Sequence, residues 1–305
     1  MTKNILLCGN DLLMEAIIQH NILQDKDIKF TWYQQEVEFP ALVQEILSAA
    51  VMAKNFSLTA TNTPKWEDID LLLIGKPISR IEKDPEENAA LRAEIHWTQL
   101  IINQAMANNF SGKVCFLSEH SEEQVFSALH FSGLPVSSIF GLGTLPVTLL
   151  AENLLSSILK IDVTQVHVDV LGTAHQTVPA WSRGLIAGAP LLSLVAQENS
   201  LFKQDYLTEI DDKLQKVTAK SLLPAVLGSL DRLFDALFSR FGLVMPLTHQ
   251  IKFGDQTIAL SEPVLLSNQG VSSMVGIKLS ENEKQQLAAI KGDVLASIQG
   301  LTGGK

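Results

Sequence analysis

A glutamate and a histidine stand side by side at a place where acid–base chemistry is possible. Glu119 and His120 follow a strand-like run that ends at Leu117, and in open α/β sheets ligands gather outside the carboxyl ends of the strands. An imidazole beside a carboxylate can form a general acid/base pair. The alternative, which the sequence favours, is that the two residues cap a following helix that has Ser121 and Glu122 in its first turn.

Two polar residues in the second half of the chain are further candidates. His175 lies in the segment GTAHQT, where a loop shift of one residue would bring it forward as a proton donor; otherwise it is a loop histidine hydrogen-bonded to backbone. Arg183 either binds an anion or lies on the surface or at a subunit contact. The seven histidines are dispersed, and neither H-E-x-x-H nor CxxC occurs, so the sequence predicts no metal site.

The turn after the first strand-like run departs from the dinucleotide-binding pattern. That pattern, G-x-G-x-x-G, uses its glycines for a tight turn, for contact with a pyrophosphate and for close helix packing. The three positions hold Gly9, Asp11 and Met14, so only the first glycine is present. Where an acid normally binds the ribose hydroxyls, the second run ends in Tyr33 and then Gln34. These replacements predict that no cofactor binds in the usual pose.

Composition narrows the class of protein. The chain has 305 residues, a formal charge of −10 and 46% hydrophobic residues. An excess of acid argues against nucleic acid or an anionic membrane surface as a partner, because both require clustered Lys and Arg. No apolar run reaches the roughly 20 residues of a membrane-spanning helix. Cys8 and Cys115 lie in apolar runs and are expected to be buried thiols, and these features together predict a cytoplasmic protein.

The order of apolar runs indicates two domains. The first half alternates short β-rich runs with helical patterns, which predicts a doubly wound, Rossmann-like parallel sheet. The second half reads as α+β and ends in a helix that begins at Ser280, whose spacing to Glu283 fits a capping box. We therefore expect domains at 1–141 and 142–305. The predicted strands of the first domain are 4–8, 29–33, 56–60, 70–74, 113–117 and 138–140.

Several segments, in order along the chain, resemble the L-lactate/malate dehydrogenase family. They are FSGLP at 131–135, GLGT at 141–144, and VPAWSRGLIAGAPL at 178–191. The segment from Val244 to Ile298 also resembles the closing sheet and helix of that family. The resemblance implies a Rossmann-like domain, a lactate/malate dehydrogenase-like C-terminal α+β domain, and a dimer or tetramer.

The resemblance also implies where catalytic residues should stand, and these positions look degenerate. The family's histidine, its orienting aspartate and its two arginines supply a proton donor and an anion clamp. A small hydroxyl residue and an asparagine complete the family's site. The equivalent positions in this chain are Ala174, Val147, Leu150, Glu87, Leu222 and Glu119. His175 stands one place after the histidine position, and Arg80 is the basic alternative to Glu87.

The sequence thus favours a family member that has lost dehydrogenase chemistry and serves in binding, sensing or assembly. In that case no cofactor is needed, and a small molecule is a possible ligand of the remodelled cleft. The alternative is an NAD-dependent L-lactate or L-2-hydroxyacid dehydrogenase with relocated catalytic residues. A third possibility is a new reaction that uses His175, Glu119 or Arg183. All of these are compatible with a homo-oligomer.

Overall fold

The computed structural model divides the chain into two compact units, Met1–Gly141 and Leu142–Lys305. It describes residues 2–9, 12–35, 38–77, 89–197, 203–273 and 276–302. None of the helices within these ranges is long and apolar enough to cross a membrane.

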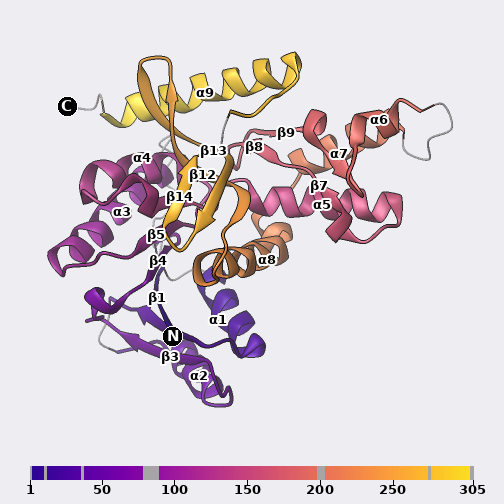
Figure 1. Cartoon of the computed structure of the whole chain (residues 1–305). Coiled ribbons are helices and arrows are strands. Elements are labelled where there is room, and N and C mark those ends of the chain that lie inside the picture. Colours follow the sequence, from indigo (N-terminus) through magenta and orange to yellow (C-terminus); the bar gives the residue numbers. More distant parts are fainter. Residues whose placement is uncertain are drawn as a thin grey trace. The chain divides into compact units, whose positions relative to one another are not determined.

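The first unit contains a parallel sheet (Figure 1). Its strand order is β3-β2-β1-β4-β5-β6, and every neighbouring pair is parallel. The Rossmann-like prediction is confirmed, and each predicted strand agrees with an observed one to within about a residue at either end. The strands are β1 (Lys3–Cys8), β2 (Ile28–Tyr33), β3 (Ser57–Thr61), β4 (Leu71–Ile74), β5 (Lys113–Phe116) and β6 (Ile139–Gly141).

The central strands of this sheet are buried on both faces, which explains their continuous apolar sequences. All four residues of Leu71–Ile74 are buried, as are the last four of β1. Cys8 and Cys115 are buried thiols in β1 and β5, as predicted, and burial raises the pKa of both. The described helices of the unit are α1 (Leu12–Gln24), α2 (Ala41–Ala50), α3 (Ala89–Ala107) and α4 (Ser121–Ser132).

Helix α3 has a buried face set by helical spacing. Leu91, Thr98, Ile101 and Ala105 recur at intervals of seven, three and four residues and are buried, as expected for an amphipathic helix. Glu94 lies on the same buried face. A carboxylate at such a position needs partners, because an unpaired buried charge is strongly destabilising.

The second unit is α+β. Strands β12, β13, β8 and β9 form an antiparallel sheet in that order, with β14 on β13, and a smaller sheet has the order β11-β10-β7. The strands are β7 (Val166–His167), β8 (Val170–Gly172), β9 (Thr177–Pro179), β10 (Leu185–Ile186), β11 (Ala189–Pro190), β12 (Leu243–Phe253), β13 (Gln256–Ser267) and β14 (Gly270–Ser273). The helices are α5 (Leu145–Leu159), the 3-10 turn η4 (Trp181–Arg183), α6 (Leu191–Val195), α7 (Gln204–Gln215), α8 (Ala219–Phe238) and α9 (Glu281–Thr302).

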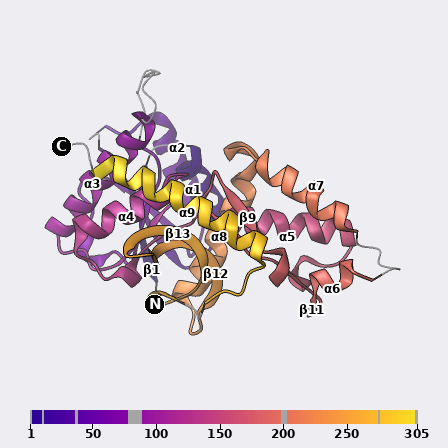
Figure 2. The same cartoon turned by 90° about the horizontal axis from the view of Figure 1, so that it is seen from above.

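The final helix, α9, packs against β13, β8 and β9 (Figure 2). Its start has the predicted capping box. The backbone N–H of Ser280 donates to Glu283 Oε2 at 2.8 Å, and the backbone N–H of Glu283 donates to Ser280 Oγ at 3.4 Å. Two backbone donors at this helix end are thereby satisfied.

Candidate active site

The turn after β1 lies at the switch point of the sheet, between β1 and β4. Gly9 has φ +147°, and a Cβ there would lie 3.1 Å from the carbonyl oxygen of Lys76 and 3.3 Å from Met14 Cε. The indole N–H of Trp32 donates to the Gly9 carbonyl at 2.9 Å. In doubly wound sheets this crevice is where a dinucleotide binds. Asp11, the second position of the glycine pattern, lies outside the described residues.

Two replacements that seemed to oppose a cofactor are accommodated in the core. Met14 is fully buried, so its side chain packs inside the protein beneath Gly9. Tyr33 is 7% exposed, and its ring lies 6.1 Å from that of Trp66. Gln34 is also buried, and its backbone N–H donates to the Thr61 carbonyl. These replacements are therefore buried side chains, and Met14 lies directly against the Gly9 turn.

His120 forms a pair with a carboxylate, but its partner is Glu94. Its Nδ1 lies 3.2 Å from Glu94 Oε2, and the Glu94 side chain is 5% exposed. The hydrogen bond to Glu94 raises the pKa of His120, with the charges of Glu94, Glu123 and Glu119 adding to the effect and burial opposing it. His120 occupies the N-cap position of α4, yet its side chain makes no capping bond. The helix-cap prediction is therefore correct for the position of His120, but its side chain does not form the cap.

Glu119 pairs with a lysine from the end of β4. Lys76 Nζ lies 2.6 Å from Glu119 Oε1 and 3.8 Å from Glu94 Oε1. Glu94, Glu119 and His120 each place one potential metal-ligating atom within 4.8 Å of the others. The ammonium beside both carboxylates already supplies the positive charge that a cation would bring. We call Lys76, Glu94, Glu119 and His120 the edge cluster, because β4 and β5 end next to it.

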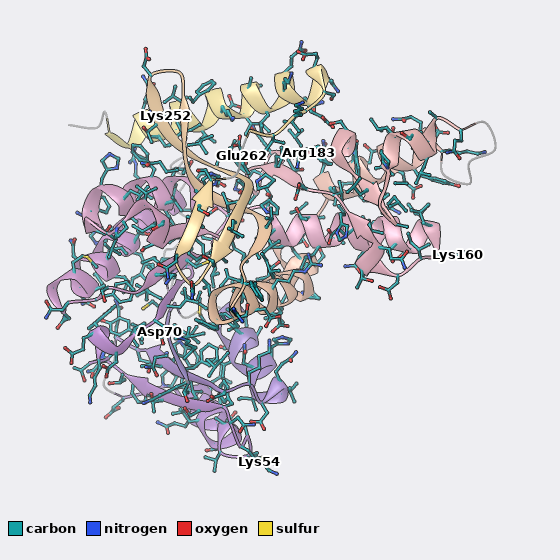
Figure 3. All side chains as sticks on the ribbon, in the orientation of Figure 1. Lys54, Asp70, Lys160, Arg183, Lys252 and Glu262 are labelled. Carbon is teal, nitrogen blue, oxygen red and sulfur yellow. The ribbon has the colours of Figure 1, made fainter. Side chains whose placement is uncertain are left out.

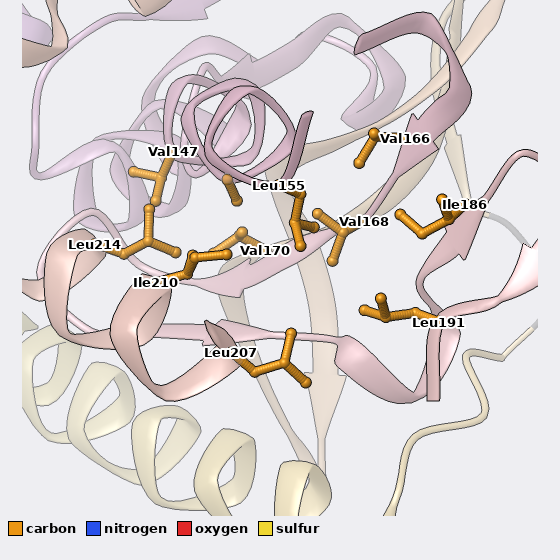
Figure 4. Packing of buried hydrophobic residues seen from close by; sticks show 11 residues of the cluster. Val147, Leu155, Val166, Val168, Val170, Ile186, Leu191, Leu207, Ile210 and Leu214 are labelled. Atoms are coloured by element: carbon orange, nitrogen blue, oxygen red, sulfur yellow. The ribbon is translucent and has the colours of Figure 1, made fainter. Parts of the chain in front are cut away.

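The positions on α5 and α8 that the resemblance assigned to catalytic residues lie in apolar surroundings. Val147 belongs to a buried hydrophobic cluster of the second unit, and Leu150 and Leu222 pack against it. In Figure 4 Val147 lies beside Ile210 and Leu214 of α7. The structure thus gathers these three positions in the core of the second unit.

The remaining candidates are dispersed. Ala174 and His175 lie in the loop between β8 and β9, where His175 is exposed and its backbone N–H donates to Thr173 Oγ1 at 3.3 Å. A catalytic role for His175 stays a prediction. Arg183 is exposed at the end of η4 (Figure 3), where its charge partly offsets the rise that burial causes in the pKa of Asp169. Glu87 and Arg80 lie outside the described residues.

Sequence reasoning missed Glu94 and Lys76. Glu94 had a detectable signal, because it is an acidic residue on the apolar stripe of a predicted helix. Lys76 follows the buried strand β4, at the carboxyl edge where functional side chains gather. Their pairing with Glu119 and His120 depends on tertiary packing, which spacing alone does not reveal.

The chain is similar to curated L-lactate dehydrogenases. It is 25% identical over 192 residues to L-lactate dehydrogenase 1 of Listeria monocytogenes, a match that covers 61% of each chain. The chain thus spans about three fifths of the length of this relative. It is 29% identical over 264 residues to L-lactate dehydrogenase 2 of Enterococcus faecalis, which covers 81% of each chain.

Solved structures share the fold. The ligand-unbound minor L-lactate dehydrogenase of Enterococcus mundtii has a TM-score of 0.85 at 19% identity, covering 98% of this chain and 97% of that one. The lactate dehydrogenase of Eimeria maxima, solved with NADH and oxamate, has a TM-score of 0.85 at 13% identity, covering 99% and 95%.

These comparisons correct two predictions. The sequence favoured a chain without dehydrogenase chemistry and without a cofactor, whereas the relatives of the chain are named L-lactate dehydrogenases and a structural neighbour was solved with NADH. The prediction assumed that each replacement side chain occupies the space of the one it replaces. Met14 and Tyr33 are buried in the core instead, and the edge cluster provides acid–base groups at other positions.

The family model for the lactate/malate dehydrogenase alpha/beta C-terminal domain matches residues 149–302, just over half of the chain. The matched residues lie within the second unit, and the solved structures share the fold of the whole chain. The chain therefore belongs to the lactate/malate dehydrogenase family.

Proposed function

We propose that this protein is an NAD-dependent dehydrogenase that interconverts 2-oxo acids and L-2-hydroxy acids, with relocated catalytic residues. The observation that carries the proposal is the His120–Glu94 pair at the carboxyl edge of a Rossmann-like sheet. Similarity to the Enterococcus faecalis L-lactate dehydrogenase 2 over 81% of each chain supports the reaction class.

The residues at the switch point fit a dinucleotide. Gly9 keeps the crevice clear of a Cβ, which would crowd the Lys76 carbonyl at 3.1 Å. Lys76 approaches this turn through its backbone carbonyl, whereas its ammonium lies 2.6 Å from Glu119 Oε1. When bound, the reduced nicotinamide supplies the hydride of the reaction and is left oxidised.

His120 supplies the proton in this proposal. Reduction of a 2-oxo acid places a hydride on C2 and a proton on the carbonyl oxygen. The protonated His120 ring donates its Nε2 proton to that oxygen as the carbonyl π electrons move onto it. His120 is then neutral and regains a proton from solvent.

Glu94 acts as a positioning residue. It accepts a hydrogen bond from His120 Nδ1–H, which fixes the orientation of the ring and favours the charged imidazolium. Lys76 pairs with Glu94 and Glu119. The acids around the ring raise the pKa of His120, so the edge cluster can hold a proton donor in its charged form.

Steady-state reduction of 2-oxo acids tests the proposed function. Purified protein is mixed with NADH and pyruvate, oxaloacetate or a branched 2-oxo acid, with an active lactate dehydrogenase as a positive control. We expect NADH absorbance to fall with saturation in one of these substrates. A rate equal to the protein-free background with all of them, at millimolar cofactor, would contradict the proposal.

Assembly and location are part of the same proposal. Leu12 and Leu23 of α1 are 80% and 87% exposed, and a second copy of the chain would remove this apolar surface from water. We propose a homo-oligomer in the cytoplasm, a compartment compatible with the free thiols of Cys8 and Cys115. Light scattering in solution and cell fractionation test these two points, and a monomeric mass would contradict the first.

A further inference from the structure

A pocket of about 270 Å³ opens in the second unit, and none of its lining residues belongs to the edge cluster. Most of its wall comes from α7, η4 and the start of α9, and β9 and α6 complete it. Trp181, Leu207 and Leu214 give it an apolar side, and Asp211 and Glu283 are its acidic residues. The pocket is independent of the proposed catalytic residues.

Two adjacent residues of η4 are each bound by a carboxylate from a different helix. The indole N–H of Trp181 donates to Asp211 Oδ1 at 3.0 Å. The backbone N–H and the hydroxyl of Ser182 donate to Glu283 at 2.9 and 2.5 Å. Since Ser280 also donates to Glu283, both Glu283 oxygens are engaged in holding the pocket together.

Asp211 is in a different situation. The Trp181 bond uses Oδ1, and among the described residues no hydrogen bond or ion pair to Oδ2 is found. Burial raises the pKa of the Asp211 carboxyl, the Trp181 bond opposes this, and the charge of Asp212 adds to the rise. A partly desolvated carboxylate of this kind gains most from a positively charged partner.

The pocket supplies acceptors but no competing cation. No Lys or Arg occurs among the described residues that line it, whereas Gln215, Asn282 and Gln286 do. An ammonium group has three N–H donors and no acceptor. One carboxylate and the side-chain amide oxygens can accept hydrogen bonds from these three donors. The apolar side of the pocket suits a short aliphatic chain.

We propose that this pocket binds a small aliphatic amine, with Asp211 as the anchor of its ammonium group. Glu283 is the second acid at the pocket, but its role is to hold η4 and α9 in place. The ligand class is therefore a primary amine or diamine. An anion or a neutral diol of the same length does not bind in this proposal, because neither can form an ion pair with Asp211.

Titration calorimetry with putrescine tests this proposal, with 1,4-butanediol as the uncharged ligand of similar length. The variant is Asp211→Asn, and the matched control is Asp212→Asn, the same change one residue along at an exposed position. Hydrogen bonds to charged groups are worth about 1.5–3 kcal/mol, so we expect D211N to weaken putrescine binding by about tenfold or more. D212N should bind as the unmodified protein does, and butanediol should give no saturable heat.

A pH series keeps the test independent of how well D211N folds. Putrescine affinity should fall as pH is lowered and Asp211 becomes protonated, with Asp212 and Glu283 as the other acids nearby. Equal binding to D211N and D212N, equal binding of butanediol, or no binding of putrescine at millimolar concentration would each overturn the proposal.

Discussion

Replacing His120 by glutamine removes the proposed proton donor with little change in shape. The glutamine amide can still donate to Glu94, which would otherwise be left buried beside Lys76 with one partner fewer. General acid catalysis contributes roughly 10² to 10⁴-fold to a rate. We therefore expect His120→Gln to lower kcat for 2-oxo acid reduction by about that factor.

The variant should leave cofactor binding nearly intact, because the switch-point turn at Gly9 is unchanged. NADH affinity by calorimetry and kcat by stopped-flow absorbance separate the two effects. His130→Gln is the matched control. It makes the same change on the same helix, α4, at an exposed histidine whose Nδ1 lies 2.8 Å from the Phe126 carbonyl oxygen.

The competing assignment is His175, the exposed loop histidine. If His120→Gln retains kcat within about twofold of the unmodified enzyme while His175→Gln loses most of it, the assignment of His120 is refuted. If both variants lose NADH binding as well, the loss reflects the cofactor site and the argument from the edge cluster fails.

The remaining predictions concern charge and packing. Glu94→Gln removes the charge that raises the pKa of His120, so the fall in kcat with rising pH should move to lower pH; an unshifted profile would contradict the positioning role. Burial raises the pKa of Glu152 from 4.5 to about 7, so its ionisation in the folded state costs up to about 3 kcal/mol. The free energy of unfolding should therefore fall as pH rises from 4.5 to about 7. Glu152→Gln should flatten this fall when unfolding by denaturant is measured across that pH range. Gly143 has φ +54°, and a Cβ would lie 2.0 Å from Ser261 Oγ. Gly143→Ala should consequently cost several kcal/mol, roughly in the range of severe core substitutions, and a Tm within a few degrees of the unmodified protein would contradict the geometry.

The sequence predicted the sheet well because buried parallel strands have continuous apolar sequences. Leu71–Ile74 lies within the predicted run 70–74, and the capping box of Ser280 and Glu283 is formed by local contacts that spacing encodes. These features depend on neighbours within a few residues. Local pattern is therefore enough to place them.

The site was harder to predict, since its contacts are distant in sequence. His120 and Glu94 are separated by 26 positions and meet because α3 packs against α4. Met14 stands where a glycine was expected, and nothing in the pattern indicates that its side chain is fully buried. A motif scores the residue type at a position but carries no information on the direction of its side chain.

Hydride transfer itself is the most direct test of the central proposal. NADH deuterated at its transferring position is incubated with the protein and, in separate samples, with pyruvate, oxaloacetate and a branched 2-oxo acid, and the products are analysed by NMR and by chiral chromatography. The proposed function predicts an L-2-hydroxy acid with one deuterium on C2 from at least one of these substrates, formed at a rate that depends on His120. Unchanged 2-oxo acid and unchanged deuterated NADH in every sample after prolonged incubation, with the control enzyme active in the same buffer, would contradict it.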